Sequence, residues 1–267
     1  AAISGYLDSH CCYINEFSCF DDDLGDRFFV RAVFRPGSDT RSIPATLREH
    51  FQPVAARFEM HWAMHELCER PKVLIMVSKL DHCLRDLLYR WRIGELKIEI
   101  VGIVSNHPDL GFLAELDGLP FHHLPISAET KPAQEEKLLQ IVAETGAELV
   151  VLARYMQVLS EDLCRRLAGR AINIHHSFLP GFKGAKPYHQ AHARGVKLIG
   201  ATAHYVTTDL DEGPIIEQVV ERVNHACSPE ALLSVGRDME CQALARAVRY
   251  HVERRVFLNG ARTVVLT

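Results

Sequence analysis

The chain has 267 residues, of which 48% are hydrophobic, and its formal net charge is −4 with histidine neutral. This length and apolar content suit one large domain, or one medium and one small domain, with a substantial core. No block of five or more lysines and arginines occurs, which argues against nucleic-acid binding, and no apolar run approaches the roughly 20 residues that span a bilayer.

The first residues show no basic stretch followed by an apolar segment, so we expect no signal peptide. The eight cysteines include no C-x-x-C pair, which argues against a zinc ribbon or a thioredoxin-like redox site. We therefore expect free, mostly buried thiols in a cytoplasmic protein.

Residues 1–67 favour a small α+β module that reads helix, strand, strand, helix, strand. Segments 11–17 and 28–34 are short and rich in aromatic and β-branched residues, with an acidic turn between them. Residues 42–58 carry apolar side chains at close to helical spacing, and Pro53 among them predicts a kink or an early end. The charged stretch at residues 66–71 indicates a boundary, which gives domains at 1–68 and 71–267.

After the boundary, short apolar strands alternate with helical patterns. The predicted strands are 73–77, 98–105, 148–153, 171–174 and 198–206, and the predicted helices are 82–91, 132–144, 160–167 and 229–257. Such alternation favours an α/β fold with a mainly parallel, Rossmann-like sheet covered on both faces. Ligands in such folds bind beyond the carboxyl ends of the strands.

Two segments carry polar residues at strand ends. Asn173 and His175 lie two apart on a strand, so both point to one face, and an amide beside an imidazole suits a carbonyl oxygen that gains negative charge. On spacing alone, side chains that only satisfy buried backbone groups explain the pattern slightly better. His204 ends another strand and is followed by Asp209 and Asp211, between which nothing local discriminates.

Three ordered blocks give these residues a context. Residues 151–159 (VLARYMQVL), 173–180 (NIHHSFLP) and 204–214 (HYVTTDLDEGP) resemble the formyltetrahydrofolate-dependent formyltransferase superfamily, over a span from about residue 72 to 222. The resemblance implies that the catalytic residues are Asn173, His175 and Asp211. It also implies a folate site, with main-chain groups reading the pterin edge, at Met156, Gln157, Leu159, Val206, Thr207, Thr208, Asp209 and Leu210.

Within the superfamily, the chain is most similar to the deformylases. Glycinamide ribonucleotide formyltransferases carry a glycine-rich phosphate-binding loop after the first strand, where this chain has VSKLDHCL at residues 77–84. Residues 184–190 also resemble deformylases. The resemblance implies hydrolysis of 10-formyltetrahydrofolate to formate and tetrahydrofolate, in one-carbon metabolism that serves purine biosynthesis. Candidate residues for the acceptor side or the water site are Lys79, Asp81, His82 and His204.

The implied mechanism needs no metal and no further cofactor. Asp211 is expected to position and deprotonate water, with burial raising its pKa above the usual value of about 3.9. Asn173 and His175 are expected to stabilise the oxyanion. The N-terminal module resembles ACT domains without their first strand, which implies an amino-acid effector site and a homo-oligomer, either a dimer or a tetramer.

Three other hypotheses remain open at this point. A zinc hydrolase would draw on His189, His192 and the other histidines near the motifs, namely His175, His176 and His204, together with Asp211, although no H-E-x-x-H motif is present. A formyltransferase to an amine acceptor would keep the same three catalytic residues. A non-catalytic amino-acid sensor would rely on the N-terminal module alone. The roles of Lys79, Lys186 and Arg154 stay unassigned.

Overall fold

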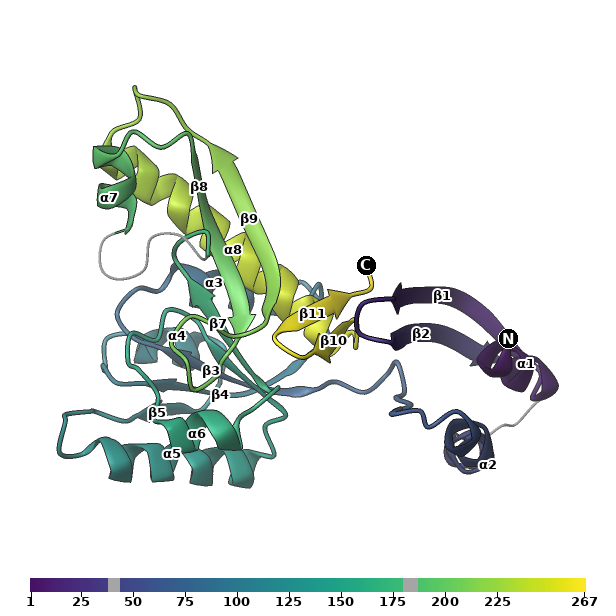
Figure 1. Cartoon of the computed structure of the whole chain (residues 1–267). Helices are drawn as coiled ribbons and strands as arrows, with labels where there is room; N and C mark the ends of the chain where they lie inside the picture. Colours follow the sequence, from purple (N-terminus) through teal and green to yellow (C-terminus); the bar gives the residue numbers. More distant parts are fainter. Residues whose placement is uncertain (38–43, 180–186) are drawn as a thin grey trace. The chain divides into compact units, whose positions relative to one another are not determined.

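The computed structural model describes residues 1–37, 44–179 and 187–267. It divides the chain into two compact units, residues 1–69 and residues 70–265 (Figure 1). Within the described ranges, no helix combines the length and the apolar character needed to cross a membrane.

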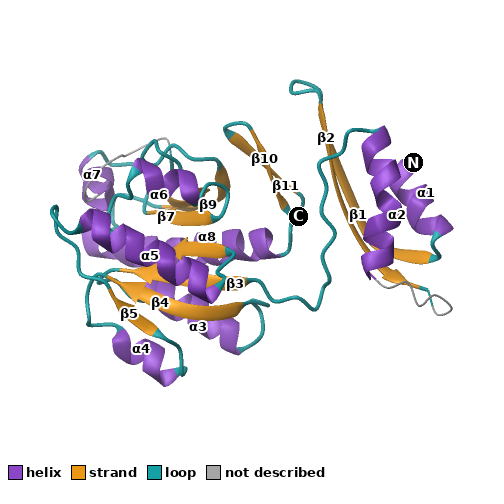
Figure 2. Cartoon of the chain, turned by 90° about the horizontal axis from the view of Figure 1, so that it is seen from below, coloured by secondary structure: helices purple, strands orange, loops and turns teal. Residues whose placement is uncertain are grey.

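The smaller unit is an antiparallel hairpin covered by two helices (Figure 2). Its elements are α1 (Ala2–Ser9), β1 (Cys12–Asp22), β2 (Arg27–Pro36) and α2 (Pro44–Arg57). The acidic segment between the strands turns tightly, and the Gly25 amide donates to the Asp22 carbonyl at 3.0 Å. The two helices are joined by the Tyr6 hydroxyl, which donates to the Leu47 carbonyl at 2.7 Å. Their apolar faces form a buried cluster of Tyr6, Leu7, Leu47, Phe51 and Ala55.

The predicted third strand of this unit is wrong. Residues 58–71 form neither a helix nor a strand. Met60 and Met64 in this segment pack against the helical cluster. Their side chains are therefore partly buried without a neighbouring strand edge, and the observed sheet has two strands in place of the expected three.

Two further expectations, an early helix end at Pro53 and mostly buried cysteines, are not met. Helix α2 continues through Pro53 to Arg57, so the proline does not end it early, while expected helix positions 42 and 43 lie outside the described residues. Of the eight free cysteines, Cys83 and Cys164 are buried, whereas Cys11, Cys19 and Cys68 are exposed. Fewer thiols are therefore buried than the sequence suggested.

The larger unit is built on one seven-stranded sheet with the order β5-β4-β3-β6-β7-β8-β9. The five strands from β5 to β7 run parallel, and β8 and β9 are antiparallel to their neighbours, which confirms a mainly parallel α/β fold. The strand bounds are β3 (Lys72–Val77), β4 (Glu99–Ser105), β5 (Phe121–His123), β6 (Leu149–Leu152), β7 (Ala171–His175), β8 (Leu198–Tyr205) and β9 (Ile215–Arg222).

Both faces of this sheet are covered by helices because its strands are apolar on both sides. In β3, Val73, Ile75 and Val77 join the core under α3 and α8, while Leu74 and Met76 join the core under α5 and α6. The helix bounds are α3 (His82–Arg92), α4 (Gly111–Leu116), α5 (Lys131–Thr145), α6 (Glu161–Arg166), α7 (Pro187–Ala193) and α8 (Pro229–Val252).

The sequence interpretation missed the chain's last strands. Helix α8 was expected to run to residue 257 but ends at Val252, and Arg254 then adopts a left-handed φ of 55°. An antiparallel hairpin follows, made of β10 (Val256–Asn259) and β11 (Arg262–Val265). Asn259-Gly260 at its turn is a strong local hairpin signal that the helical period obscured. Strand β9 was missed because its outer half is polar.

Candidate active site

The site begins at the carboxyl end of β7. Asn173 and His175 project from this strand to the same side, and His175 is its last residue. The His175 side chain is buried, with 5% of its surface exposed. The position that the sequence predicted for both residues, at a strand end in a mainly parallel sheet, is therefore confirmed.

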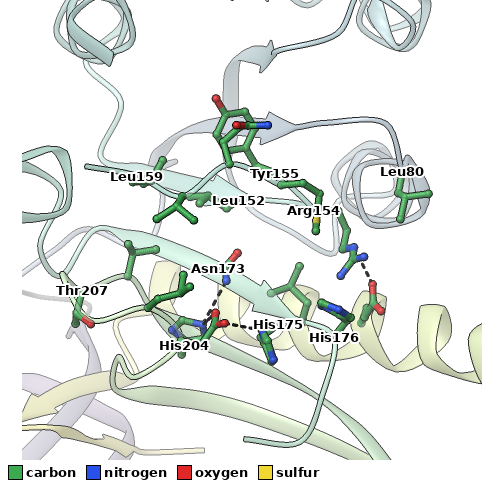
Figure 3. Close-up of a pocket in the computed structure, with 18 of the residues that line it drawn as sticks. Leu80, Leu152, Arg154, Tyr155, Leu159, Asn173, His175, His176, His204 and Thr207 are labelled. Atoms are coloured by element: carbon green, nitrogen blue, oxygen red, sulfur yellow. Dashed lines mark hydrogen bonds and ion pairs between the residues drawn. The ribbon is translucent and has the colours of Figure 1, made fainter. Parts of the chain in front are cut away.

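Asp211 reaches the same place from the loop between β8 and β9. One carboxylate oxygen lies 3.2 Å from His175 Nδ1, and the other lies 3.7 Å from His204 Nε2 (Figure 3). Strand pairing places Asn173 opposite His204, with Asn173 Nδ2 at 3.3 Å from His204 Nε2. The structure thus brings Asn173, His175 and Asp211 together across 36 residues of intervening chain (211 − 175).

The backbone holds the Asp211 loop tightly. Asp211 has a φ of 58°, a left-handed conformation that costs energy for most residues but that aspartate tolerates. Two residues later, a Cβ at Gly213 would overlap the carbonyl oxygen of Tyr205. The Tyr205 amide in turn donates to the Pro214 carbonyl at 3.0 Å. Glycine at position 213 therefore permits the close approach that aims Asp211 at the histidines.

The hydrogen bonds define which ring nitrogens carry protons. His204 Nδ1 faces the Tyr205 carbonyl at 2.9 Å and must donate to it, so Nε2 of the neutral ring accepts from the Asn173 amide. His175 Nδ1 donates to Asp211 by the same reasoning. His175 Nε2 is buried and has no hydrogen-bond partner in the part of the chain that the structure describes.

The expectation that burial raises the pKa of Asp211 is wrong. Burial does act in that direction, but the hydrogen bond from His175 and the nearby His204 ring outweigh it. The pKa of Asp211 is therefore lowered below its ordinary value, and the carboxylate is anionic at neutral pH. The sequence could not reveal this because the contact of Asp211 with His175, 36 positions earlier (211 − 175), exists only in the fold.

These residues line a cavity of about 590 Å³. In Figure 3, Leu159 and Thr207 lie on one side of His175, and Arg154 and His176 lie on the other. The first end is apolar, with Leu152 and Leu159 among its walls, and the second end is polar and charged. All eight predicted folate-site residues line this cavity: Met156, Gln157, Leu159, Val206, Thr207, Thr208, Asp209 and Leu210.

The charged end contains a network that the sequence interpretation missed. The Glu240 side chain, only 2% exposed, lies with one oxygen 2.7 Å from His82 Nε2 and 3.3 Å from Arg154 Nε. The Tyr188 hydroxyl donates to its other oxygen at 3.2 Å. Glu240 was detectable in principle, because it lies four residues after Gly236 and three before Ala243, on the buried stripe of α8.

The candidate acceptor-side residues divide into two groups. His82 and His204 line the cavity, but His204 contacts the catalytic residues, not the charged end. Lys79 and Asp81 are not among the residues that line it, so their assignment to the acceptor side stays a prediction. Asp81 begins helix α3 and forms an ion pair with Arg85 one turn later, and Lys79 is exposed.

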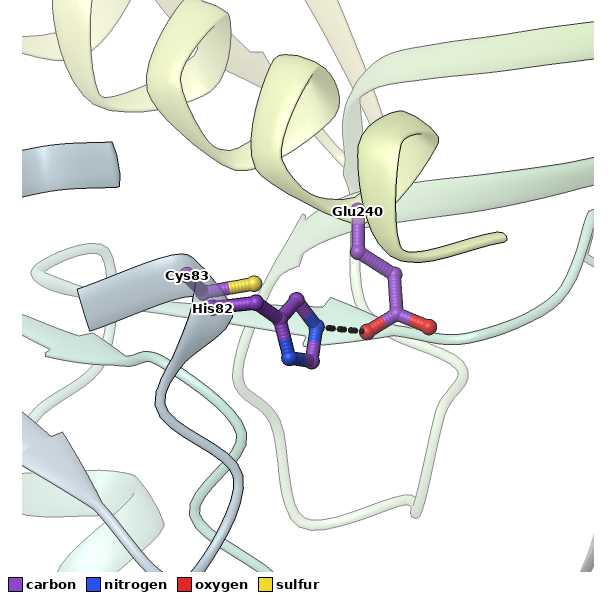
Figure 4. A group of neighbouring side chains, drawn as sticks. All are labelled: His82, Cys83 and Glu240. Atoms are coloured by element: carbon purple, nitrogen blue, oxygen red, sulfur yellow. Dashed lines mark hydrogen bonds and ion pairs between the residues drawn. The ribbon is translucent and has the colours of Figure 1, made fainter. Parts of the chain in front are cut away.

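One side-chain group in the described residues has metal-ligand spacing, namely His82, Cys83 and Glu240 (Figure 4). It is a different set from the one that the zinc hypothesis drew from the sequence. The Arg154 guanidinium lies 3.3 Å from the Glu240 oxygen that would bind a cation. A hydrogen bond with Cys241, together with burial, raises the pKa of the Cys83 thiol, which disfavours the thiolate that metals require. A hydrogen-bonded ion pair explains this group better than a metal site.

Comparisons with known proteins agree with this geometry. Residues 71–248 match the formyl transferase family. The chain is 56% identical over 265 residues to a formyltetrahydrofolate deformylase of Corynebacterium sp. (strain P-1), covering 99% of this chain and 92% of that protein.

Solved structures extend this similarity to the fold. A formyltetrahydrofolate deformylase crystal structure from Burkholderia mallei is 67% identical, with a TM-score of 0.94 over 100% of this chain and 94% of that one. A glycinamide ribonucleotide transformylase structure from Symbiobacterium toebii is 28% identical, with a TM-score of 0.71 over 78% of this chain and 99% of that one.

Proposed function

The chain belongs to the formyltetrahydrofolate deformylase family, and from that premise we propose that Asn173, His175 and Asp211 hydrolyse 10-formyltetrahydrofolate to formate and tetrahydrofolate. The observation that carries the proposal is their convergence. An amide, an imidazole and a carboxylate meet in the middle of one cavity, with Asp211 at 3.2 Å from His175. These groups suit attack on a carbonyl carbon and stabilisation of the resulting oxyanion.

The apolar end of the cavity is our candidate folate site. Leu152, Leu159 and Val206 offer walls for a flat aromatic ring system, and the backbone of residues 206–210 offers hydrogen-bonding groups for the pterin edge. A pterin bound at this end would direct its formyl-bearing nitrogen toward Asn173 and His175. The formyl group would then lie beside the Asp211 carboxylate.

Each of the three side chains receives one role. Asn173 already donates one Nδ2 hydrogen toward His204, which fixes the amide and leaves the second hydrogen for the developing oxyanion. His175 presents its buried Nε2 to the same reaction centre. Asp211 holds the attacking water by accepting its hydrogen bond, and its negative charge stabilises His175 as a proton carrier.

The proton balance uses the His175–Asp211 pair as a unit. The water oxygen bonds to the formyl carbon while one water proton passes to the pair. The carbon–nitrogen bond then breaks, and the proton moves to N10 of the departing tetrahydrofolate. Because the pKa of Asp211 is lowered, we assign the proton to the pair and not to the carboxylate alone. The balance requires neither a metal nor a redox cofactor.

The decisive experiment is incubation with 10-formyltetrahydrofolate alone, with formate and tetrahydrofolate quantified separately. We expect both products in equal amounts without any added acceptor. Product formation that depends on an added amine would replace hydrolysis with formyl transfer. Full activity in the Asn173→Ala and His175→Ala variants would show that the reaction takes place elsewhere.

We further propose that the smaller unit serves assembly and regulation. Its hairpin carries exposed aromatic side chains, including Tyr13, Phe17 and Phe28, which favour contact with another copy of the chain. The unit is also our candidate for an amino-acid effector site. Sedimentation analysis of wild type and of Tyr13→Ser/Phe28→Ser tests assembly, and a monomeric wild type would contradict it. Formate release measured with each amino acid tests regulation.

A further inference from the structure

The charged network at the polar end of the cavity has no role in the chemistry proposed above. It consists of His82, Arg154, Tyr188 and Glu240, which come from four separate segments of the larger unit. Arg154 and Glu240 are both buried, with 8% and 2% of their surfaces exposed. Burying such groups is costly unless they are paired, so their position beside the candidate catalytic residues requires an explanation.

The position of the network bears on how a nucleophile reaches the formyl carbon. His176 contacts both the candidate catalytic residues and the network. Its ring centroid lies 5.1 Å from that of His175 and 6.5 Å from that of Tyr188. A nucleophile adds to the formyl carbon from one face of the planar formamide, so it needs free space beside that group and next to the folate. With folate at the apolar end, the space that remains beside Asp211 and His175 is bounded on its other side by the network.

We propose that the Arg154–Glu240–His82–Tyr188 network occupies the space that an amine acceptor would need, and so restricts the nucleophile to water. The proposal rests on the proposed function and deepens it by naming residues that determine acceptor specificity. Water needs a volume of only roughly 30 Å³ and can approach beside the network. An amine carried on a larger molecule would have to displace buried charges that hold one another in place.

The surrounding backbone keeps the network rigid. A Cβ at Gly236 would overlap the Tyr188 ring, so glycine there allows the hydroxyl to reach Glu240 one turn further along α8. Arg154 has a φ of 64°, and its carbonyl accepts from the Ser78 amide at 3.2 Å. The Ser78 hydroxyl accepts from the Met156 amide at 2.9 Å, which holds the loop that carries Arg154.

The charges of the network also favour a fixed arrangement of its side chains. Burial would raise the pKa of Glu240, but the hydrogen bond from His82 and the charge of Arg154 outweigh it and lower the pKa. Burial, with the charge of Arg154, lowers the pKa of His176 to about 4, so this ring is neutral at physiological pH. A cationic ammonium group approaching Arg154 would meet like charge, whereas neutral water would not.

The test is a partition measurement with the whole protein. The variant Arg154→Gly/Glu240→Gln removes both charges, opens the space and suits the left-handed backbone at position 154. Its matched control is Arg254→Gly/Glu148→Gln, which removes another Arg–Glu pair whose arginine also has a positive φ, 55°, and which does not line the cavity. Each protein receives 10-formyltetrahydrofolate and a high concentration of glycinamide or hydroxylamine.

The quantity compared is the ratio of formylated amine to formate. Wild type and the control should form almost only formate, while the network variant should raise the ratio by about tenfold or more, the scale at which one pocket contact discriminates. Both products come from the same donor complex, so partial misfolding of a variant does not change their ratio. Arg154→Lys, which keeps the charge, should remain hydrolytic.

Two results would overturn the inference. One is an unchanged ratio in a network variant that still turns over donor, and the other is a comparable rise in the control. Failure of the proposed function would look different, because wild type would then release no formate from 10-formyltetrahydrofolate alone. If the double variant turns over no donor, the conservative Glu240→Gln and Tyr188→Phe variants are compared in the same way, and unchanged ratios in both would also reject the inference.

Discussion

The Asp211 side chain is held by both neighbouring imidazoles, yet it faces the cavity. Its contacts to His175 and His204 lower its pKa, and its left-handed backbone shows that the surrounding structure imposes this position. Asp209, two residues earlier on the same loop, has a different environment. It is exposed, and its main-chain carbonyl, not its carboxylate, accepts from Thr207 Oγ1 at 3.0 Å.

We expect Asp211→Asn to reduce kcat by about 10²- to 10⁴-fold, the usual effect of losing a positioned proton acceptor. The substitution is nearly isosteric, so packing should survive. Affinity for a tetrahydrofolate analogue should change little, because the apolar end of the cavity keeps all its side chains. Formate release and analogue binding measured on the same preparations provide the test.

Asp209→Asn is the control, and its kcat should stay close to that of wild type because its carboxylate does not contact His175. A larger loss in Asp209→Asn than in Asp211→Asn, with analogue affinity unchanged, would mean that the catalytic carboxylate has been misassigned.

At this scale, the sequence predicted where the candidate residues lie better than it predicted their chemical state. The two-residue spacing at a strand end placed Asn173 and His175 on one face, but their assignment as catalytic residues came from the resemblance to a family. Asp211 and Asp209 were indistinguishable on local grounds, and the resemblance to a family separated them. The pKa of Asp211 depends on His175 and His204, which only the fold brings into contact, so the expected direction was wrong.

The loop between β8 and β9 tests how strongly catalysis depends on backbone position. Gly213→Ala places a methyl group against the Tyr205 carbonyl, so the loop must shift and carry Asp211 away from His175. We expect kcat to fall by about 10²-fold, as for a misplacement of roughly 1 Å. Overpacking should also lower the free energy of unfolding by about 1–3 kcal/mol.

Gly118→Ala separates these two effects. Gly118 has a φ of 64° and open space around its Cβ position, and it lies outside the cavity. Its substitution should cost about 1–2 kcal/mol of stability through backbone strain and leave kcat unchanged. If both alanine variants lost kcat equally, the effect would reflect general destabilisation and not the position of Asp211.

Elements with strong periodicity were predictable, and elements defined by their partners were not. The apolar runs of β3 and β6 are buried on both faces, so their sequences alone indicate central strands. Strand β9 lies at the sheet edge with a polar outer half, and it is a strand because it pairs with β8. Residues 58–71 show the converse. Apolar residues in this segment pack against a helical cluster, and without a strand partner they form no strand.

At the scale of the whole molecule, our proposal assigns hydrolysis to the larger unit and assembly and regulation to the smaller one. Asn173, His175, Asp211 and the cavity that they line all belong to residues 70–265, which also contain two extensive cores. Deletion of residues 1–69 should therefore leave hydrolysis of the same order of magnitude, provided that circular dichroism shows a folded domain. A folded deletion variant without activity at saturating substrate would show that the smaller unit contributes to the chemistry.

Acid should destabilise the larger unit through two of its histidines. Burial lowers the pKa of both His176 and His251 to about 4. An unfolded histidine has a pKa near 6.5, so between these values the unfolded state binds more protons than the folded state. Stability is therefore fully retained above about pH 6.5 and is lost as the pH falls toward 4. We expect a loss on the order of 1–2 kcal/mol per histidine between pH 7 and pH 5.

The variant His251→Gln should reduce the acid-induced loss of unfolding free energy by the contribution of one histidine, about 1–2 kcal/mol. In the folded protein, His251 Nδ1 lies 2.7 Å from the Tyr205 hydroxyl and accepts from it when neutral, a bond that glutamine can also accept. Urea unfolding in a Trp62→Phe background isolates the larger unit, because Trp91 is then the single tryptophan. The exposed His123→Gln serves as the control and should leave the loss unchanged. An undiminished loss in His251→Gln, or stability that rises on acidification, would contradict the argument that burial of this ring opposes its protonation.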